Sequence, residues 1–306
     1  MAKYLDGLPA VKDVKNWPNS YGRGITITTK HYTIHTTLLD PLMLRQIPAF
    51  MESAHRAYQK QLPKPISTQT KFTVYFFAKR DQWEEFTEGF AGPNAHIYLQ
   101  IKKGAYYLNG ACVAYNIGRS RSFSVLAHEG WHQFDSKHFA YRLPSWLDEG
   151  IATLFETSTY EKGNFTFQPE RNGGRLGSLR KAILSNKMIP LQKLIALNPG
   201  EVVNDIDAIS AFYGQSYALV RFLREDGYGK HLSKYHNLLL GALRGNWPLD
   251  PRLRQIAANR NIPMTARFNR FVSTKLFTLY IEEDFGAIER EYLSFCKKII
   301  YHVRLK

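Results

Sequence analysis

The chain contains the stretch Ser124-Val-Leu-Ala-His128-Glu129-Gly-Trp-His132-Gln-Phe134, which sets a His-Glu-x-x-His pattern among apolar residues. On an α-helix, residues four apart lie above one another on the same face. His128 and His132 are therefore expected to hold one metal ion together. Glu129 is offset by one position, so it can take a proton from a metal-bound water without binding the metal itself, as zinc hydrolases require. The alternative is a chance match in a core helix, where each of these buried polar groups would need a partner.

The composition is that of a soluble globular protein, and it limits the metal ligands. The 306 residues suffice for one large domain or two small ones, with 44% hydrophobic and 22% charged residues. The two cysteines, Cys112 and Cys296, allow one disulfide at most and exclude a zinc site built from thiolates. Any zinc is therefore expected to be held by histidine and carboxylate side chains.

Neither a membrane span nor a secretory signal is expected from the sequence. No stretch approaches the roughly eighteen uninterrupted apolar residues that a membrane helix needs. The N-terminus, Met1-Ala-Lys-Tyr-Leu-Asp-Gly7, lacks the apolar core of a signal peptide. A signal could already have been removed, which leaves the compartment open and allows an extracytoplasmic location.

The chain is strongly basic, with a formal net charge of +15. Such a charge favours anionic partners through long-range attraction. The basic residues are scattered and form no nucleic-acid motif, so no specific nucleic-acid partner is expected. This scatter is illustrated by Arg252, Arg254, Arg260, Arg267 and Arg270. A basic surface that serves solubility, or affinity for an acidic polymer, explains the charge equally well.

The first part of the chain is expected to be a sheet with a few helices. Residues 1–24 are rich in Pro, Gly and Lys and are interpreted as an N-terminal arm. Asp40-Pro41 offers a helix N-cap followed by proline at the first helical position. The β-branched and helical patterns predict strands at 25–29, 31–37, 72–77 and within 95–116, and helices at about 41–60 and 81–86.

Asn109-Gly110 is a hairpin signal, and it places residues 111–115 on a strand directly before the metal-binding helix. Two interpretations of this strand stay open. It is either an edge strand that receives an extended substrate by backbone pairing, or an ordinary strand inside the sheet.

The second part of the chain is expected to be mainly helical. The metal-binding helix is predicted at about 121–136, a second helix at 145–156, and further helices from residue 173 onward. The predicted domains are the arm 1–24, an α+β sheet lobe 25–120, and a metal-helix and helical lobe 121–306 that forms one catalytic unit with 25–120. The fold class is therefore α+β, with a mixed sheet lobe followed by a mainly helical lobe.

A catalytic zinc usually has three protein ligands, and two residues are candidates for the third. His138 follows His132 by six residues, which is the histidine spacing of the metzincins, although Asp135 stands where their pattern has glycine. Glu149 follows the helix-start residues Pro144 and Ser145, so its carboxylate could point toward the two histidines.

The segment Trp146-Leu-Asp-Glu149-Gly150-Ile-Ala resembles the Trp-Leu-Asn-Glu-Gly-Phe-Ala segment of the gluzincins, notably the aminopeptidase-N family. It is closer still to the bacterial peptidase-MA-like family, which combines His-Glu-x-x-His with Trp-Leu-x-Glu-Gly. The resemblance implies a thermolysin-like zincin catalytic domain, a zinc cofactor, and Glu149 as the third zinc ligand beside His128 and His132. It also implies a peptide or protein substrate.

Two departures concern the aminopeptidases specifically. Sixteen residues lie between His132 and Glu149, a slightly shorter spacing than in their pattern. Their Gly-x-Met-Glu-Asn motif, which recognises the substrate N-terminus, is missing. Aminopeptidase specificity is therefore not implied.

Candidates for supporting roles follow the glutamate. Ala211-Phe-Tyr213-Gly-Gln-Ser-Tyr217 resembles the region that supplies the oxyanion-binding tyrosine in these families, and Tyr213 lies 64 residues after Glu149. Tyr217, one turn later, is the weaker candidate, and both tyrosines could instead be core residues. Asp148, Glu156 and Asp135 could accept a hydrogen bond from a metal-binding imidazole, and Glu156 is favoured.

These features predict a zinc metallopeptidase with His128, His132 and Glu149 as ligands, Glu129 as general base and Tyr213 as oxyanion donor. The alternatives are a non-catalytic binding module stabilised by zinc, and a zinc amidase that acts on a non-peptide substrate of the cell-wall type. The sequence indicates neither the cleavage specificity nor the oligomeric state.

Overall fold

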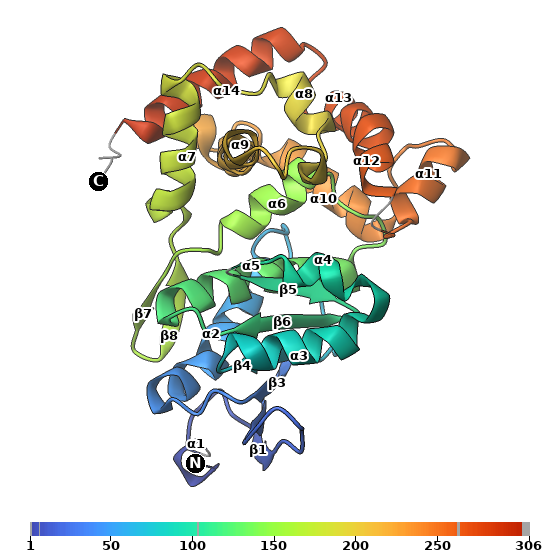
Figure 1. Cartoon of the computed structure of the whole chain (residues 1–306). Coiled ribbons are helices and arrows are strands. Elements are labelled where there is room, and N and C mark those ends of the chain that lie inside the picture. Colours follow the sequence, from blue (N-terminus) through green and yellow to red (C-terminus); the bar gives the residue numbers. More distant parts are fainter. Residues whose placement is uncertain (1, 6, 103, 262–263, 302–306) are drawn as a thin grey trace. The chain divides into compact units, whose positions relative to one another are not determined.

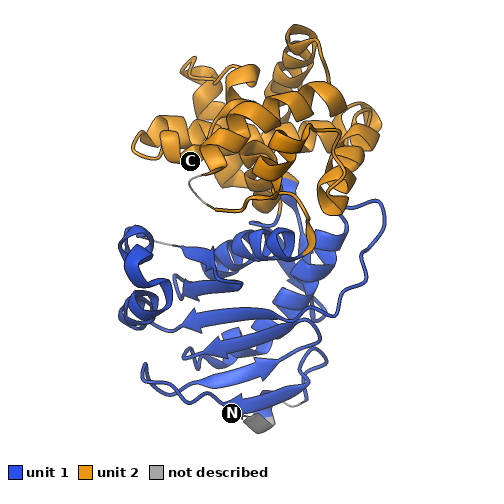
Figure 2. Ribbon diagram, turned by 90° about the vertical axis from the view of Figure 1, so that its right-hand side faces the viewer, with its two compact units in different colours: residues 1–137, 155–169 blue, residues 138–154, 170–306 orange. Residues whose placement is uncertain are grey.

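A computed structural model describes residues 2–5, 7–102, 104–261 and 264–301. The chain divides into two compact units (Figure 2). Unit 1 comprises Met1–Lys137 and Phe155–Pro169, and unit 2 comprises His138–Leu154 and Glu170–Lys306. Among the residues that the structure describes, no helix combines the length and the apolar character needed to span a membrane.

Unit 1 contains a mixed six-stranded sheet in the order β1-β2-β3-β4-β6-β5. Neighbouring strands pair antiparallel except β3–β4 and β4–β6, which are parallel. The strands are β1 (Asp13–Asn16), β2 (Ile25–Thr28), β3 (Tyr32–Thr36), β4 (Phe72–Phe77), β5 (Ala105–Leu108) and β6 (Ala111–Tyr115). The expected mixed sheet is thus present, and β1 lies inside the segment 1–24 that was predicted as an arm.

Helices cover both faces of this sheet because its central strands are apolar on both sides. On β4, Phe77 points into a cluster with Trp83 of α3, whereas Phe72 lies 6.4 Å from the Phe134 ring of α5. Side chains alternate along a strand, so one apolar run can serve two helical layers. The helices of unit 1 are α1 (Ala2–Leu5), α2 (Pro41–Gln59), α3 (Arg80–Ala91), α4 (Ala95–Leu99) and α5 (Arg119–His138).

Helix boundaries agree with the sequence where a cap is strong and differ where it is weak. The Asp40 side chain accepts a hydrogen bond of 2.8 Å from the Met43 amide, and α2 begins at Pro41 as predicted. In contrast, α3 begins at Arg80 and continues beyond Phe86 to Ala91, because Phe86, Thr87 and Ala91 lie on its buried face. The segment 95–116, within which only strands were predicted, begins with the helix α4.

The strand before α5 lies inside the sheet. Asn109 and Gly110 adopt positive φ angles of 49° and 81°, as a tight hairpin requires. This hairpin turns β5 back along β6, so β6 is paired with β4 on one side and with β5 on the other. The interpretation of residues 111–115 as an edge strand is therefore wrong, and the interpretation as a strand inside the sheet is confirmed. Strand β5 lies at that edge of the sheet.

A second sheet in unit 1 is a hairpin that the sequence analysis did not predict. Strands β7 (Ser158–Glu161) and β8 (Asn164–Phe167) pair antiparallel around Lys162-Gly163, whose φ angles are 49° and 82°. The hairpin packs on α2, where the Phe165 amide donates to Ser53 Oγ at 3.2 Å. The alternation Thr-Tyr-Glu-Lys-Gly-Asn-Phe-Thr-Phe around a Gly turn is the signal that could have revealed it.

Unit 2 is helical and is built around α9 (Ile206–Glu225), on which α6, α7, α10 and α14 pack (Figure 1). Its other helices are α6 (Ser145–Thr153), α7 (Gly173–Leu184), α8 (Leu191–Ala196), α10 (Leu232–Arg244), α11 (Pro251–Ala258), α12 (Thr265–Phe268), α13 (Thr274–Tyr280) and α14 (Phe285–Ile300), with a π-helical turn at Asn269–Ser273. Helix α6 ends three residues before the predicted end at Glu156. Helix α5, except for its last residue His138, belongs to unit 1.

The contact between α6 and α9 depends on Gly150. A Cβ atom at this position would lie 2.5 Å from the Ser216 carbonyl oxygen and 2.6 Å from Val220 Cγ2. These distances are far below van der Waals contact, so a backbone this close is possible only beside glycine.

Gly150→Ala is expected to lower the free energy of unfolding by about 1–3 kcal/mol, because the added methyl group forces the two helices apart. Gly177 of α7 is the matched control, since a Cβ there meets no atom within 4 Å. Gly177→Ala is expected to raise the unfolding free energy by about 0.5–1 kcal/mol through helix propensity. Urea unfolding measures both, and a Gly150→Ala protein as stable as Gly177→Ala would contradict the close packing.

Candidate metal centre

The two histidines of the His-Glu-x-x-His pattern lie one turn apart on α5. Their ring centroids are 5.0 Å apart, with an angle of 70° between the ring planes. Both side chains are partly exposed. His128 and His132 thus present their imidazoles on one side of the helix, as the spacing predicts.

Glu149 of α6 completes a group that could hold a metal ion. One ligand atom each of His128, His132 and Glu149 lies within 4.8 Å of the other two. Ligands of a tetrahedral zinc lie about 3.3 Å from one another, so small side-chain movements bring these three to one ion. Within the described residues, no other group of three or more His, Cys, Asp or Glu side chains meets this criterion, and His138 does not belong to it.

Glu156 holds the ring of His128. The Nδ1 atom of His128 donates to Glu156 Oε1 at 3.0 Å, and the two side chains are only 12% and 10% exposed. This contact leaves Nε2 of His128 as the nitrogen with a lone pair for a metal. Glu156 was favoured for this role because it would lie two turns beyond Glu149 on one helix. It instead follows the end of α6 and precedes β7.

The sheet of unit 1 anchors α5 through Gln133, the residue after His132. Its Nε2 donates to the carbonyl oxygens of Thr73 and Gly110, each at 2.8 Å. Gln133 is fully buried, and buried hydrogen bonds of this kind are costly to break. The amide therefore fixes the height and rotation of the helix at its metal-binding turn.

On the other flank, α2 anchors α5 through Tyr58. The hydroxyl of Tyr58 donates to the Ala127 carbonyl at 2.7 Å, directly before His128. A Cβ at residue 130 would lie 2.5 Å from this hydroxyl, so Gly130 provides the space for it. Burial raises the pKa of Tyr58 well above its ordinary value, and the phenol stays a neutral donor.

Glu129 lies on α5 between these anchors and is partly exposed. Burial raises the pKa of the Cys112 thiol, and the negative charge of Glu129 adds to this effect. The same charge adds to the raised pKa of Tyr58.

The two candidate tyrosines on α9 have different surroundings. The Arg175 guanidinium lies 4.7 Å from the centre of the Tyr213 ring, and Tyr213 is partly exposed. Tyr217 is fully buried, its hydroxyl accepts a hydrogen bond of 2.8 Å from Arg221 Nη1, and burial raises its pKa to about 12. Tyr217 is thus a core residue held by Arg221.

No protein-family model matches the chain, and the comparison with curated proteins gives no significant match. The resemblance to the gluzincins therefore depends on the two short motifs around His128 and Glu149 and on the Tyr213 segment. The arrangement of the first two motifs is the structural observation that bears on it.

Zinc binding is expected to depend on each of His128, His132 and Glu149. Wild-type protein dialysed against zinc should retain about one ion per chain, whereas His132→Ala and Glu149→Ala should lose it because three ligands are needed for tight binding. Glu156→Ala should weaken zinc affinity by about 10–100-fold, because the His128 ring is then no longer held in one orientation. Elemental analysis after dialysis measures the bound metal.

His138→Ala is the control for these variants, and it should keep its zinc. Loss of zinc from His138→Ala together with full occupancy in Glu149→Ala would assign the third ligand to the histidine instead.

Proposed function

We propose that this chain is a zinc-dependent metallopeptidase of the gluzincin type with a thermolysin-like zincin fold. The observation that carries the proposal is the group of His128, His132 and Glu149, with Glu129 adjacent to the first of them. Two imidazoles and one carboxylate leave the fourth position of a tetrahedral ion open to water or substrate. Structural zinc sites, by contrast, are closed by four protein ligands.

The proposed mechanism assigns one role to each residue. His128, His132 and Glu149 hold the ion, which when bound acidifies water and polarises a carbonyl group. Glu129 accepts the proton of the attacking water and passes it to the departing amine. Glu156 keeps the His128 ring in one orientation and tautomer through the Nδ1 contact.

Tyr213 is proposed as the donor to the oxyanion that forms from the scissile carbonyl. Its helix, α9, packs against the helix of Glu149 at the Gly150 contact, within unit 2. This packing gives Tyr213 and Glu149 a fixed relation to each other. A preorganised donor is effective because it needs no reorganisation during the reaction.

One edge of the sheet in unit 1 supports the proposal that the substrate is a peptide. Strand β5 has β6 on one side, and in the described part of the chain no strand pairs with its other side. An extended peptide can add to such an edge through main-chain hydrogen bonds, which fits many sequences. The substrate is therefore proposed to be a peptide or an unfolded segment of a protein.

Glu129→Gln is expected to retain zinc and to lower kcat/KM for a cleavable peptide by about 10²–10⁴-fold, because the amide cannot accept the proton. Hydrolysis of a quenched fluorescent peptide library, run beside elemental analysis, measures both properties. Turnover at the wild-type rate by the zinc-loaded variant would refute the mechanism.

Tyr213→Phe is expected to lower kcat by about 10²–10³-fold with little change in KM, since the lost hydrogen bond exists only in the transition state. Tyr217→Phe serves as the control, because its hydroxyl contacts Arg221 in the core. It should lower thermal stability and leave kcat nearly unchanged. Equal kcat values for Tyr213→Phe and wild type would remove Tyr213 from the mechanism.

A further inference from the structure

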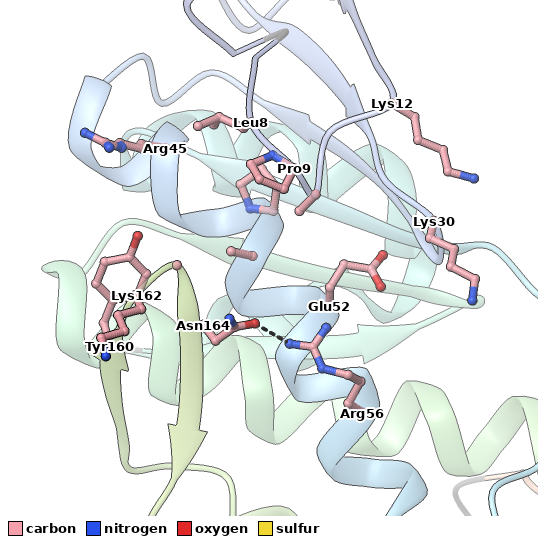
Figure 3. A pocket seen from close by; sticks show the side chains of 14 residues that line it. Leu8, Pro9, Lys12, Lys30, Arg45, Glu52, Arg56, Tyr160, Lys162 and Asn164 are labelled. Carbon is pink, nitrogen blue, oxygen red and sulfur yellow. Dashed lines mark hydrogen bonds between the residues drawn. The ribbon is translucent and has the colours of Figure 1, made fainter.

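Unit 1 contains a pocket of about 590 Å³ with features of a binding site (Figure 3). Its walls come from α2, the segment before β1, the turn between β2 and β3, and the β7–β8 hairpin. None of the proposed zinc ligands lines it. Pockets for small ligands commonly measure about 300–1,000 Å³, so this one has the size for a small organic molecule.

The pocket is lined by five basic side chains, contributed by separate segments. They are Lys12, Lys30, Arg45, Arg56 and Lys162. Figure 3 shows Lys12 and Lys30 at one side and Arg45 and Lys162 toward the other. None of the five forms an ion pair with a carboxylate of the described residues. Such a concentration of positive charge attracts anions.

The acidic residue of the pocket, Glu52, is held by groups other than these cations. Its Oε1 accepts hydrogen bonds from Thr29 Oγ1 at 2.6 Å and from the His31 amide at 2.8 Å. His31 Nδ1 lies 2.7 Å from Oε2. Burial alone would raise the pKa of Glu52, but these hydrogen bonds keep it below its ordinary value. The buried carboxylate is thus satisfied, and the basic side chains remain available to a ligand.

Arg56 is fixed in place before any ligand binds. Its Nη2 donates to Ser53 Oγ at 2.8 Å and to Asn164 Oδ1 at 2.9 Å, which ties α2 to β8 (Figure 3). A guanidinium has five N–H donors in a rigid plane, so others remain for an oxyanion. Preorganised donors bind more tightly because less conformational freedom is lost.

The remaining wall of the pocket is less polar. Leu8, Pro9, Pro48 and Ala49 line the pocket as well. Figure 3 shows the Tyr160 ring on the side of the β7–β8 hairpin. Tyr160 is 43% exposed. Rings of this kind provide flat apolar surface for the body of a ligand, while cations at the rim bind its charged groups.

We propose that this pocket binds a small organic anion that carries at least two negative charges, as phosphate or carboxylate groups, at a site separate from the metal centre. The charged groups contact the basic side chains on both sides of the pocket. The less polar body of the ligand lies on Pro9, Pro48 and Tyr160.

Isothermal titration of the full-length protein tests this proposal, with adenosine 5′-diphosphate and citrate as polyanionic probes and adenosine as the neutral control. At least one polyanion is expected to bind, with an affinity that falls as salt is raised, because exposed charges are screened. Preference for either probe supports the site and identifies the anionic group. Binding should persist in His132→Ala, since neither probe needs the metal. Absence of binding by both polyanions, or its loss in His132→Ala, would overturn the proposal.

A matched pair of double variants locates the binding. Arg45→Gln with Lys162→Gln removes two exposed charges from the pocket, and the dissociation constant should rise by about fivefold or more. Lys64→Gln with Arg252→Gln removes the same charge from exposed positions outside the pocket, and should leave the constant within about twofold. Equal weakening by both pairs would assign the binding to the overall charge of the chain and refute the site.

Discussion

The position of α5 is the constraint on which the proposed chemistry depends. Two hydrogen bonds from the buried Gln133 side chain tie the helix to the sheet, and one from Tyr58 ties it to α2. The last of these requires Gly130, because any side chain there would collide with the phenol. Each such bond contributes about 1 kcal/mol and leaves a costly unsatisfied group when broken. The residues between and beside His128 and His132 thus serve the placement of the helix.

The β7–β8 hairpin extends this support to the imidazole itself. Glu156 precedes β7 and accepts the hydrogen bond of His128, while the far end of the hairpin is tied to α2 through Arg56 and Asn164. The same element therefore orders the His128 ring and forms one wall of the basic pocket. These two contacts lie at opposite ends of one antiparallel pair.

Sequence patterns were sufficient for features that depend on local chemistry. Asp40-Pro41 and Asn109-Gly110 each force one backbone conformation, and α2 and the β5–β6 hairpin lie where these signals place them. The grouping of Glu149 with the two histidines was expected from the resemblance of the Trp146-Leu-Asp-Glu149-Gly150 segment to the gluzincins, and the three side chains lie together. Contacts between segments far apart in the sequence could not be predicted from local patterns. The position of β6 inside the sheet depends on its pairing with β4. The basic pocket brings together residues as distant in sequence as Lys12 and Lys162. No periodicity within one segment could reveal such a cluster.

The central claim is that His128, His132 and Glu149 form a three-ligand zinc site. X-ray absorption spectroscopy of the zinc-loaded protein at the zinc edge tests this claim most directly. The account predicts two imidazole nitrogens at about 2.0 Å, carboxylate oxygen from one residue, and one exchangeable water. It predicts further that His138→Ala binds zinc and gives an unchanged spectrum, because His138 lies outside the group of ligands. A third imidazole that disappears in His138→Ala, or a shell closed by four protein ligands, would contradict it.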